Sequence, residues 1–220
     1  MAATLFDAPD LETLADLQKH LGEIPAWRIR LRPAPGTAKV KDVLAIYKKE
    51  KRLFELVDGV LVEKAMSFKA SWLAIVLARY LLDFVEPWNL GLVAGEAGMV
   101  RLKFDLVRIP DVCFVSWDRI PGGKVPDEPI PKLAPNLAVE VLSDSNTPAE
   151  MKRKRREYFK AGVSLVWTVD PETRTVVVHT SVKKFKTLTE AHTLDGGAVL
   201  PGFTLSLQKL FAALDLKAPA

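Results

Sequence analysis

Residues 137–142 have the sequence Leu137-Ala-Val-Glu-Val-Leu142, an apolar run typical of a buried β-strand. A helix is predicted next over residues 148–161, because Pro148 suits a first helical turn, and a second apolar run follows over residues 163–169. Strands followed by a helix and a further strand are typical of a mixed α/β domain. We therefore expect an α/β fold, or α+β with a mixed sheet, in which helices flank one central sheet.

The chain before this stretch predicts a hairpin, a long helix and more strands. Asp58-Gly59 lies between two apolar runs, so residues 54–62 are expected to form a β-hairpin. A helix is expected over residues 68–85, where apolar positions cover most of the circumference. Further strands are expected over residues 91–95, 98–104 and 107–116. Five prolines between residues 117 and 135 predict a long irregular surface loop.

The amino-terminal part of the sequence has a different character. A helix is expected over residues 10–21, with Asp10 as its cap. A proline-punctuated arm follows, and after it a basic helix capped by Thr37. We expect residues 1–36 to be an N-terminal extension that packs on a main domain of residues 37–220.

Composition favours a globular protein of a reducing compartment. The 220 residues, 49% of them hydrophobic, suit one sizeable domain with a real core. The net charge of +4 is compatible with a polyanionic partner without requiring one. Cys113 is the only cysteine, which excludes an internal disulfide and a thiolate-rich zinc site. No basic signal region precedes Asp10, and the apolar stretch 72–82 is too short for a membrane span, so a cytoplasmic protein is expected.

Three acidic residues lie inside apolar, strand-like runs, namely Glu55, Asp111 and Glu140. A carboxylate in a core strand must be neutralised, paired or bound to a cation, since burying it bare costs at least several kcal/mol. Three such acids suggest one shared cation. Oxygen ligands with no histidine nearby favour Mg²⁺ or Mn²⁺ over zinc.

The positions of these acids allow them to meet. Residues two apart share a face of a strand, so Glu140 points the same way as Ala138, and Asp111 the same way as Cys113. If the two strands are neighbours, the two acids can converge. Five consecutive basic residues, 152–156, lie on the helix predicted after Glu140, and helical geometry spreads them around its axis. Some of these five side chains must face solvent, while one could point toward the acids.

Several motifs in this order resemble the PD-(D/E)XK nuclease superfamily, and more closely its Uma-type restriction endonuclease branch. The motifs span roughly residues 40–212 and are Phe54-Glu-Leu-Val-Asp-Gly59, Pro110-Asp111, Val139-Glu-Val-Leu-Ser143, Lys154 four residues before Tyr158, and Gly162-Val-Ser-Leu-Val-Trp-Thr-Val-Asp-Pro171. The resemblance implies a restriction-endonuclease-like core that hydrolyses DNA phosphodiester bonds with Mg²⁺ or Mn²⁺.

The resemblance also implies roles for particular residues. Asp111, Glu140 and Val141 would hold the metal, and Glu55 would lie beside them. The superfamily lysine, two residues after Glu140, is replaced by Leu142 in this chain.

The Uma-type branch takes that lysine from the next helix, which implies Lys154 as the catalytic lysine. Relatives often carry a histidine within residues 67–75, where this chain has Lys69 and Ser71. Because symmetric cleavage of duplex DNA usually needs two sites, a homodimer is a further hypothesis.

Other interpretations remain open. Glu55 could be a strand residue paired with a surface lysine, Asp111 a strand-start residue, and the run 152–156 a solvated helix face. The chain could then be a nuclease fold retained for binding nucleic acid or protein, in which Leu142 at the position of the superfamily lysine indicates that nuclease activity has been lost. A third interpretation is a structural partner protein that docks through its proline-rich loop. Metal binding through Asp111 and Glu140 discriminates the enzyme from both.

Overall fold

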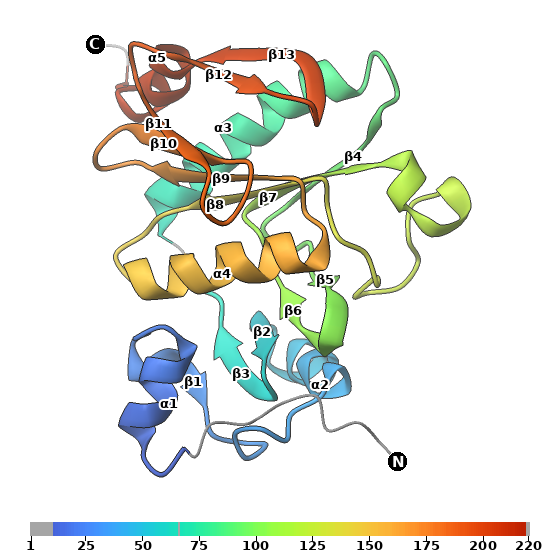
Figure 1. Ribbon diagram of the computed structural model, residues 1–220, viewed down its shortest axis with the longest axis vertical. Helices are drawn as coiled ribbons and strands as arrows, with labels where there is room; N and C mark the ends of the chain where they lie inside the picture. Colours follow the sequence, from blue (N-terminus) through green and yellow to red (C-terminus); the bar gives the residue numbers. More distant parts are fainter. Residues whose placement is uncertain (1–10, 66, 219–220) are drawn as a thin grey trace.

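Two β-sheets lie on opposite sides of helix α4 (Pro148–Ala161) in the computed structural model, which describes residues 11–65 and 67–218 (Figure 1). The larger sheet consists, in spatial order, of β11 (Phe185–Thr189), β10 (Thr175–His179), β9 (Leu165–Asp170), β8 (Leu137–Val141), β7 (Val112–Ser116) and β4 (Gly91–Gly95). The smaller sheet consists of β1 (Ile29–Arg30), β3 (Val60–Glu63), β2 (Phe54–Val57), β6 (Val107–Arg108) and β5 (Val100–Arg101).

The remaining elements cover these sheets. They are the helices α1 (Leu14–Leu21), α2 (Val40–Glu50), α3 (Phe68–Val85) and α5 (Leu207–Phe211), and a separate two-stranded sheet of β12 (Thr193–Gly196) and β13 (Leu200–Ser206). Short 3-10 turns occur at Ala26–Arg28, Lys103–Asp105, Trp117–Arg119, Pro121–Gly123 and Ala212–Leu214. The mixed α/β fold expected from the sequence is confirmed, although the strands form two larger sheets rather than one.

The segment β8-α4-β9 is built as the sequence predicts. β8 and β9 pair in parallel, while the other neighbours in the larger sheet are antiparallel, so the sheet is mixed. A parallel pair needs a crossover connection, and α4 supplies it. The helix begins at Pro148 behind the Thr147 cap, whose hydroxyl accepts a hydrogen bond from the Glu150 N–H, and it ends at the left-handed Gly162.

The two faces of the larger sheet carry different layers. Leu73 and Leu77 of α3 belong to the buried cluster that covers one face together with Phe114 and Trp167, and the carboxyl-terminal strands close this cluster. The opposite face packs against α4, where Tyr158 lies fully buried. In Figure 1, α4 is therefore seen between the larger sheet and the smaller one.

The chain crosses from the smaller sheet to the larger sheet at Ile109-Pro110-Asp111. The sequence predicts one strand over 107–116, but the structure divides it into β6 and β7, which belong to different sheets. Proline cannot donate a ladder hydrogen bond, and this accounts for the break at Pro110. The crossing places Asp111 where the two sheets meet beneath α4.

The amino-terminal part joins the smaller sheet. Arg30 of β1 pairs with Leu61 of β3 in an antiparallel ladder. The predicted hairpin over 54–62 is present as β2 and β3, with Asp58 and Gly59 both at positive φ in the turn.

Three local predictions need correction. Thr37 does not cap α2, because its hydroxyl donates to the Ala34 carbonyl, and the helix begins instead where the Asp42 carboxylate accepts from the Lys39 N–H. The capping box of Thr13 and Asp16 starts α1, whereas the predicted cap, Asp10, lies outside the described residues. The strand predicted over 98–104 is reduced to the two residues of β5.

Candidate active site

Asp111 and Glu140 lie opposite each other where β7 begins and β8 ends, in the interior of the larger sheet. β7 and β8 are antiparallel with Val112 opposite Val139, so one step further along this register brings the two acids together. The main chain of β8 holds Asp111 through two hydrogen bonds. The Asp111 N–H donates to the Val139 carbonyl at 3.0 Å, and Asp111 Oδ2 accepts from the Val141 N–H at 2.6 Å. The strand pairing on which convergence depends is therefore present.

Helix α4 presents two side chains to Glu140. The Lys154 ammonium donates to Glu140 Oε2 at 2.9 Å, and the Tyr158 hydroxyl donates to Oε1 at 2.5 Å. These residues are four apart and share one face of the helix. Burial, followed by the charge of Glu140, raises the pKa of Tyr158 far above its ordinary value, so its phenol stays protonated and remains a donor.

Glu55 of β2 approaches the same place from the smaller sheet. Its Oε2 accepts from Arg108 Nη1 at 2.6 Å and its Oε1 accepts from the Ile109 N–H at 3.1 Å. Lys154 Nζ lies 3.3 Å from Glu55 Oε1, so this lysine joins the acids of both sheets. Burial alone would raise the pKa of Glu55, but Lys154, Arg108 and Lys64 outweigh it and hold that pKa well below its ordinary value.

Lys64, which the sequence does not predict as a site residue, lies between Asp111 and Glu140. Its Nζ is 2.7 Å from Asp111 Oδ1 and 3.6 Å from Glu140 Oε2. The alternation of side chains along the hairpin is a signal for this position. Glu55 is paired with Val62 and shares its face of the sheet, and Lys64, two residues after Val62, lies on that same face.

Arg108 was missed as well, and it completes a balanced set of charges. The carboxylates of Glu55, Asp111 and Glu140 are matched by Lys64, Lys154 and Arg108, and every one of these side chains is at most 5% exposed. Arg108 also binds Glu157, whose side chain is 16% exposed. The sequence suggests one cation shared by three acids, whereas the structure neutralises them with three cationic side chains of the chain itself.

The resemblance predicts that a divalent ion would be held by Asp111, Glu140 and the main chain of Val141. Within the described residues, no three acidic, histidine or cysteine side chains come close enough to hold an ion by themselves. Two carboxylates nevertheless suffice for Mg²⁺ when water and substrate oxygens complete its coordination.

Two observations of the chain fit such an ion. Asp111 Oδ1 is buried without a hydrogen bond of good geometry, although Lys64 lies beside it in an ion pair. The N–H and carbonyl of a strand residue point toward the same neighbour, so the Val141 carbonyl faces the side of Asp111. Burial and the nearby Glu140 raise the pKa of Asp111 despite Lys64, and added positive charge would relieve this repulsion.

The positions that depart from the superfamily pattern lie just outside this cluster. Leu142, where the pattern has lysine, lines a cavity of about 360 Å³ together with Ser143 and Asp144 at the end of β8. In the stretch 67–75, where the resemblance predicts a histidine, Lys69 pairs with Glu172 at 2.7 Å. Ser71 donates to Glu96 at 3.0 Å.

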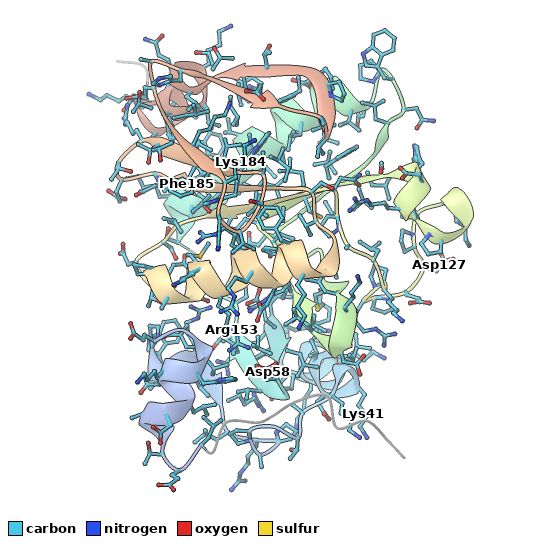
Figure 2. All side chains as sticks on the ribbon, viewed as in Figure 1. Lys41, Asp58, Asp127, Arg153, Lys184 and Phe185 are labelled. Atoms are coloured by element: carbon cyan, nitrogen blue, oxygen red, sulfur yellow. The ribbon has the colours of Figure 1, made fainter. Side chains whose placement is uncertain are left out.

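The five consecutive basic side chains of α4, residues 152–156, point in different directions around the helix axis, as helical geometry requires. Lys154 is paired with the acids of the site, and Arg153 is paired with Glu157. Arg153 also pairs with Asp58 of the β2-β3 turn, and the two residues are labelled in Figure 2. Lys152 and Arg156 line a second cavity, of about 870 Å³, together with Lys19 of α1 and Lys103.

The mixed sheet with helices on both faces is the fold of the restriction-endonuclease-like class of proteins. The model of the Uma2 family, described as "Putative restriction endonuclease", matches residues 40–208. The chain belongs to this family, and the family supports a nuclease function.

A solved structure shares the fold. The crystal structure of a protein from Anabaena variabilis, described as a "putative nuclease belonging to DUF820", superposes with a TM-score of 0.67 at 21% sequence identity, covering 74% of this chain and 92% of that one. No curated protein matches the sequence. Among the described residues, no helix has the length and apolar character required to cross a membrane.

Proposed function

We propose that the chain is a metal-dependent endonuclease that hydrolyses phosphodiester bonds of DNA, with Glu55, Asp111, Glu140 and Lys154 as its catalytic residues. The observation that carries this proposal is the convergence of Asp111 and Glu140 on neighbouring strands, with Lys154 Nζ 2.9 Å from Glu140 Oε2. Family membership supports the same reaction class.

Each residue has a distinct role in this proposal. Asp111, Glu140 and the Val141 carbonyl would hold Mg²⁺ or Mn²⁺, which when bound acidifies water and offsets charge on the phosphate. Lys154 is held between Glu140 and Glu55, so its ammonium is fixed where it can donate to a phosphate oxygen or orient a water. Glu55 acts by fixing the position of this ammonium group.

A nucleic acid is the proposed substrate because the cavity between α1 and α4 is basic, and the restriction endonuclease family favours DNA. Lys19, Lys103, Lys152 and Arg156 line it, and basic side chains grouped on one surface attract the phosphates of a nucleic acid backbone. Acidic residues in its lining, among them Glu157, are engaged with arginines. Binding should therefore weaken steeply as salt rises.

Two organisational proposals accompany the function. The first proposal is that residues 37–220 are the nuclease domain and residues 1–36 an extension, whose described part packs on the smaller sheet through β1 and α1. The second is a homodimer, since cleavage of both strands of a duplex calls for two sites. Sedimentation of the protein with bound DNA tests the dimer, because a strict monomer would remove it.

The test is cleavage of plasmid and single-stranded DNA with Mg²⁺ or Mn²⁺. We expect Glu140→Gln and Lys154→Met to abolish cleavage without unfolding the protein. Lys186→Met is the control, since it removes the same charge from an exposed pair with Asp195 on β11, the outermost strand of the larger sheet, and lines neither cavity. Equal loss in Lys154→Met and Lys186→Met would contradict the role of Lys154.

A nuclease fold retained for binding nucleic acid or protein is the second candidate function. The charge balance of the site favours it, because three acids are matched by Lys64, Lys154 and Arg108 without a metal. Binding of Mn²⁺ separates the two functions: a parent protein that binds no Mn²⁺ and cuts no DNA, but retains DNA, is a binding module.

A further inference from the structure

The Lys64 ammonium occupies the space beside Asp111 and Glu140, the two acids that would hold a divalent ion. Its Nζ is 2.7 Å from Asp111 Oδ1 and 3.6 Å from Glu140 Oε2, and the side chain is 5% exposed. Mg²⁺ binds carboxylate oxygens at about 2.0–2.1 Å. An ion bound to Asp111 Oδ1 would therefore lie within about 5 Å of the ammonium, and two desolvated positive charges at that separation repel strongly.

We propose that Lys64 is a built-in competitor of the divalent cation, whose ammonium group occupies the carboxylate pair and must leave before a metal binds. The inference rests on the proposed function in one respect, namely that Asp111 and Glu140 are the metal ligands. Its consequence is that the affinity of the site for metal is set by Lys64 as well as by the acids.

The attachment of Lys64 to the chain suits a group that leaves. Its N–H donates to the Leu53 carbonyl at 2.9 Å, so the main chain stays anchored, while the residue itself lies just past the end of β3. The four-carbon stem of a lysine can then carry the ammonium away without a change in the sheet. Lys154, in contrast, lies in the middle of α4 and is held by two acids at once.

The decisive comparison is Mn²⁺ binding, followed by electron paramagnetic resonance of the free ion, for the parent protein and for Lys64→Met. We expect Kd to fall at least tenfold, because the variant keeps both carboxylates and loses the competing charge. Lys69→Met is the matched control: it removes the same charge five residues away from an exposed pair with Glu172, and we expect no change. Asp111→Asn added to Lys64→Met should abolish the gain. A change in Kd of less than threefold for Lys64→Met overturns the inference.

The parent protein provides a test that needs no variant. Reductive methylation with mass spectrometric readout reports how accessible each lysine is. We expect Lys64 to be modified slowly without metal and several times faster with saturating Mn²⁺, while Lys69 is modified equally in both conditions. Equal protection of Lys64 with and without Mn²⁺ overturns the inference even if every Lys64 variant unfolds.

These readouts separate the inference from the proposed nuclease function. If the parent cuts DNA but Lys64→Met binds Mn²⁺ no more tightly, the competitor role fails and the nuclease stands. If Lys64→Met binds Mn²⁺ tightly through Asp111 but no form cuts DNA, the competitor role stands and the nuclease fails. If neither parent nor variant binds Mn²⁺, the competitor role is overturned.

Discussion

Replacing Arg28 by methionine should destabilise the protein far more than the same change at Arg30. Both arginines belong to the amino-terminal part of the chain and both bind a glutamate through two nitrogens. They differ in burial: the Arg28–Glu150 pair is 1% and 3% exposed, whereas the Arg30–Glu50 pair is 29% and 27% exposed. The comparison therefore isolates the effect of burying the pair.

The magnitude follows from what remains after Arg28 is removed. Its guanidinium binds Glu150 at 2.8 and 3.0 Å and also the carbonyls of Glu63 and Ser145. Losing one partner of a buried pair costs about 3–5 kcal/mol, because the other charge stays buried. Glu150 retains a hydrogen bond from Asn146 and lies in the first turn of α4, where the helix dipole favours an anion. We therefore expect about 3 kcal/mol for Arg28→Met and about 0.5 kcal/mol for Arg30→Met.

Urea unfolding followed by circular dichroism measures both effects. With a denaturant slope of about 3 kcal/mol per molar, the midpoint should fall by about 1 M in Arg28→Met. The double variant Arg28→Met, Glu150→Met should recover most of the loss, since two apolar side chains of similar volume leave no buried charge. A cost below about 1 kcal/mol for Arg28→Met, or a double variant as unstable as the sum of the single ones, would refute the reasoning.

Three further predictions concern pH, backbone conformation and metal removal. Burial and then the charge of Arg155 lower the pKa of His179 to about 4. The unfolded chain therefore binds a proton more readily than the folded protein, and the free energy of unfolding should fall by about 2 kcal/mol as pH drops from 7 to 4. In His179→Leu this pH dependence of the free energy of unfolding should be weaker. Gly59→Ala should destabilise by more than about 2 kcal/mol, since φ is +70° and a Cβ would lie 2.4 Å from the Gly36 backbone. Gly197→Ala should cost about 1 kcal/mol, because φ is +53° but a Cβ would make only an ordinary contact with Asp195 Oδ1 at 3.9 Å. Because the buried acids are matched by cations of the chain, EDTA should leave the thermal midpoint unchanged within error, and a fall of several degrees would contradict that charge balance.

The elements with strong local signals could be predicted from the sequence. Helix α3 begins at Phe68 and ends at Val85, as its apolar pattern and the following proline indicate, and α4 has the predicted bounds as well. Caps were less predictable, because several side chains near a helix start compete for the same N–H groups. Thr37 is a good cap by residue type, yet Asp42, placed in the first turn, accepts from the Lys39 N–H instead.

The acids of the candidate site were predictable because a carboxylate inside an apolar run is unusual. Their convergence was not, since a period of two fixes the face of a strand but not its neighbour. The division of residues 107–116 between two sheets depends on tertiary packing around Pro110, and only the structure shows that this crossing brings Asp111 to Glu140.

The cations were harder to predict than the acids for a physical reason. A lysine at the end of a strand is ordinarily a surface residue, and its long stem lets it reach a buried partner without changing the local pattern. The period of the hairpin places Lys64 on the face of Glu55, but Lys64 and Arg108 are distant in sequence from Glu140, so local periodicity carries no signal that brings either cation to Glu140. Because the fold itself neutralises the three acids, we expect that stability does not depend on a metal. Metal binding then becomes an exchange of one cation for another, which is why the identity of the residue at position 64 should matter for metal affinity as much as the ligands do.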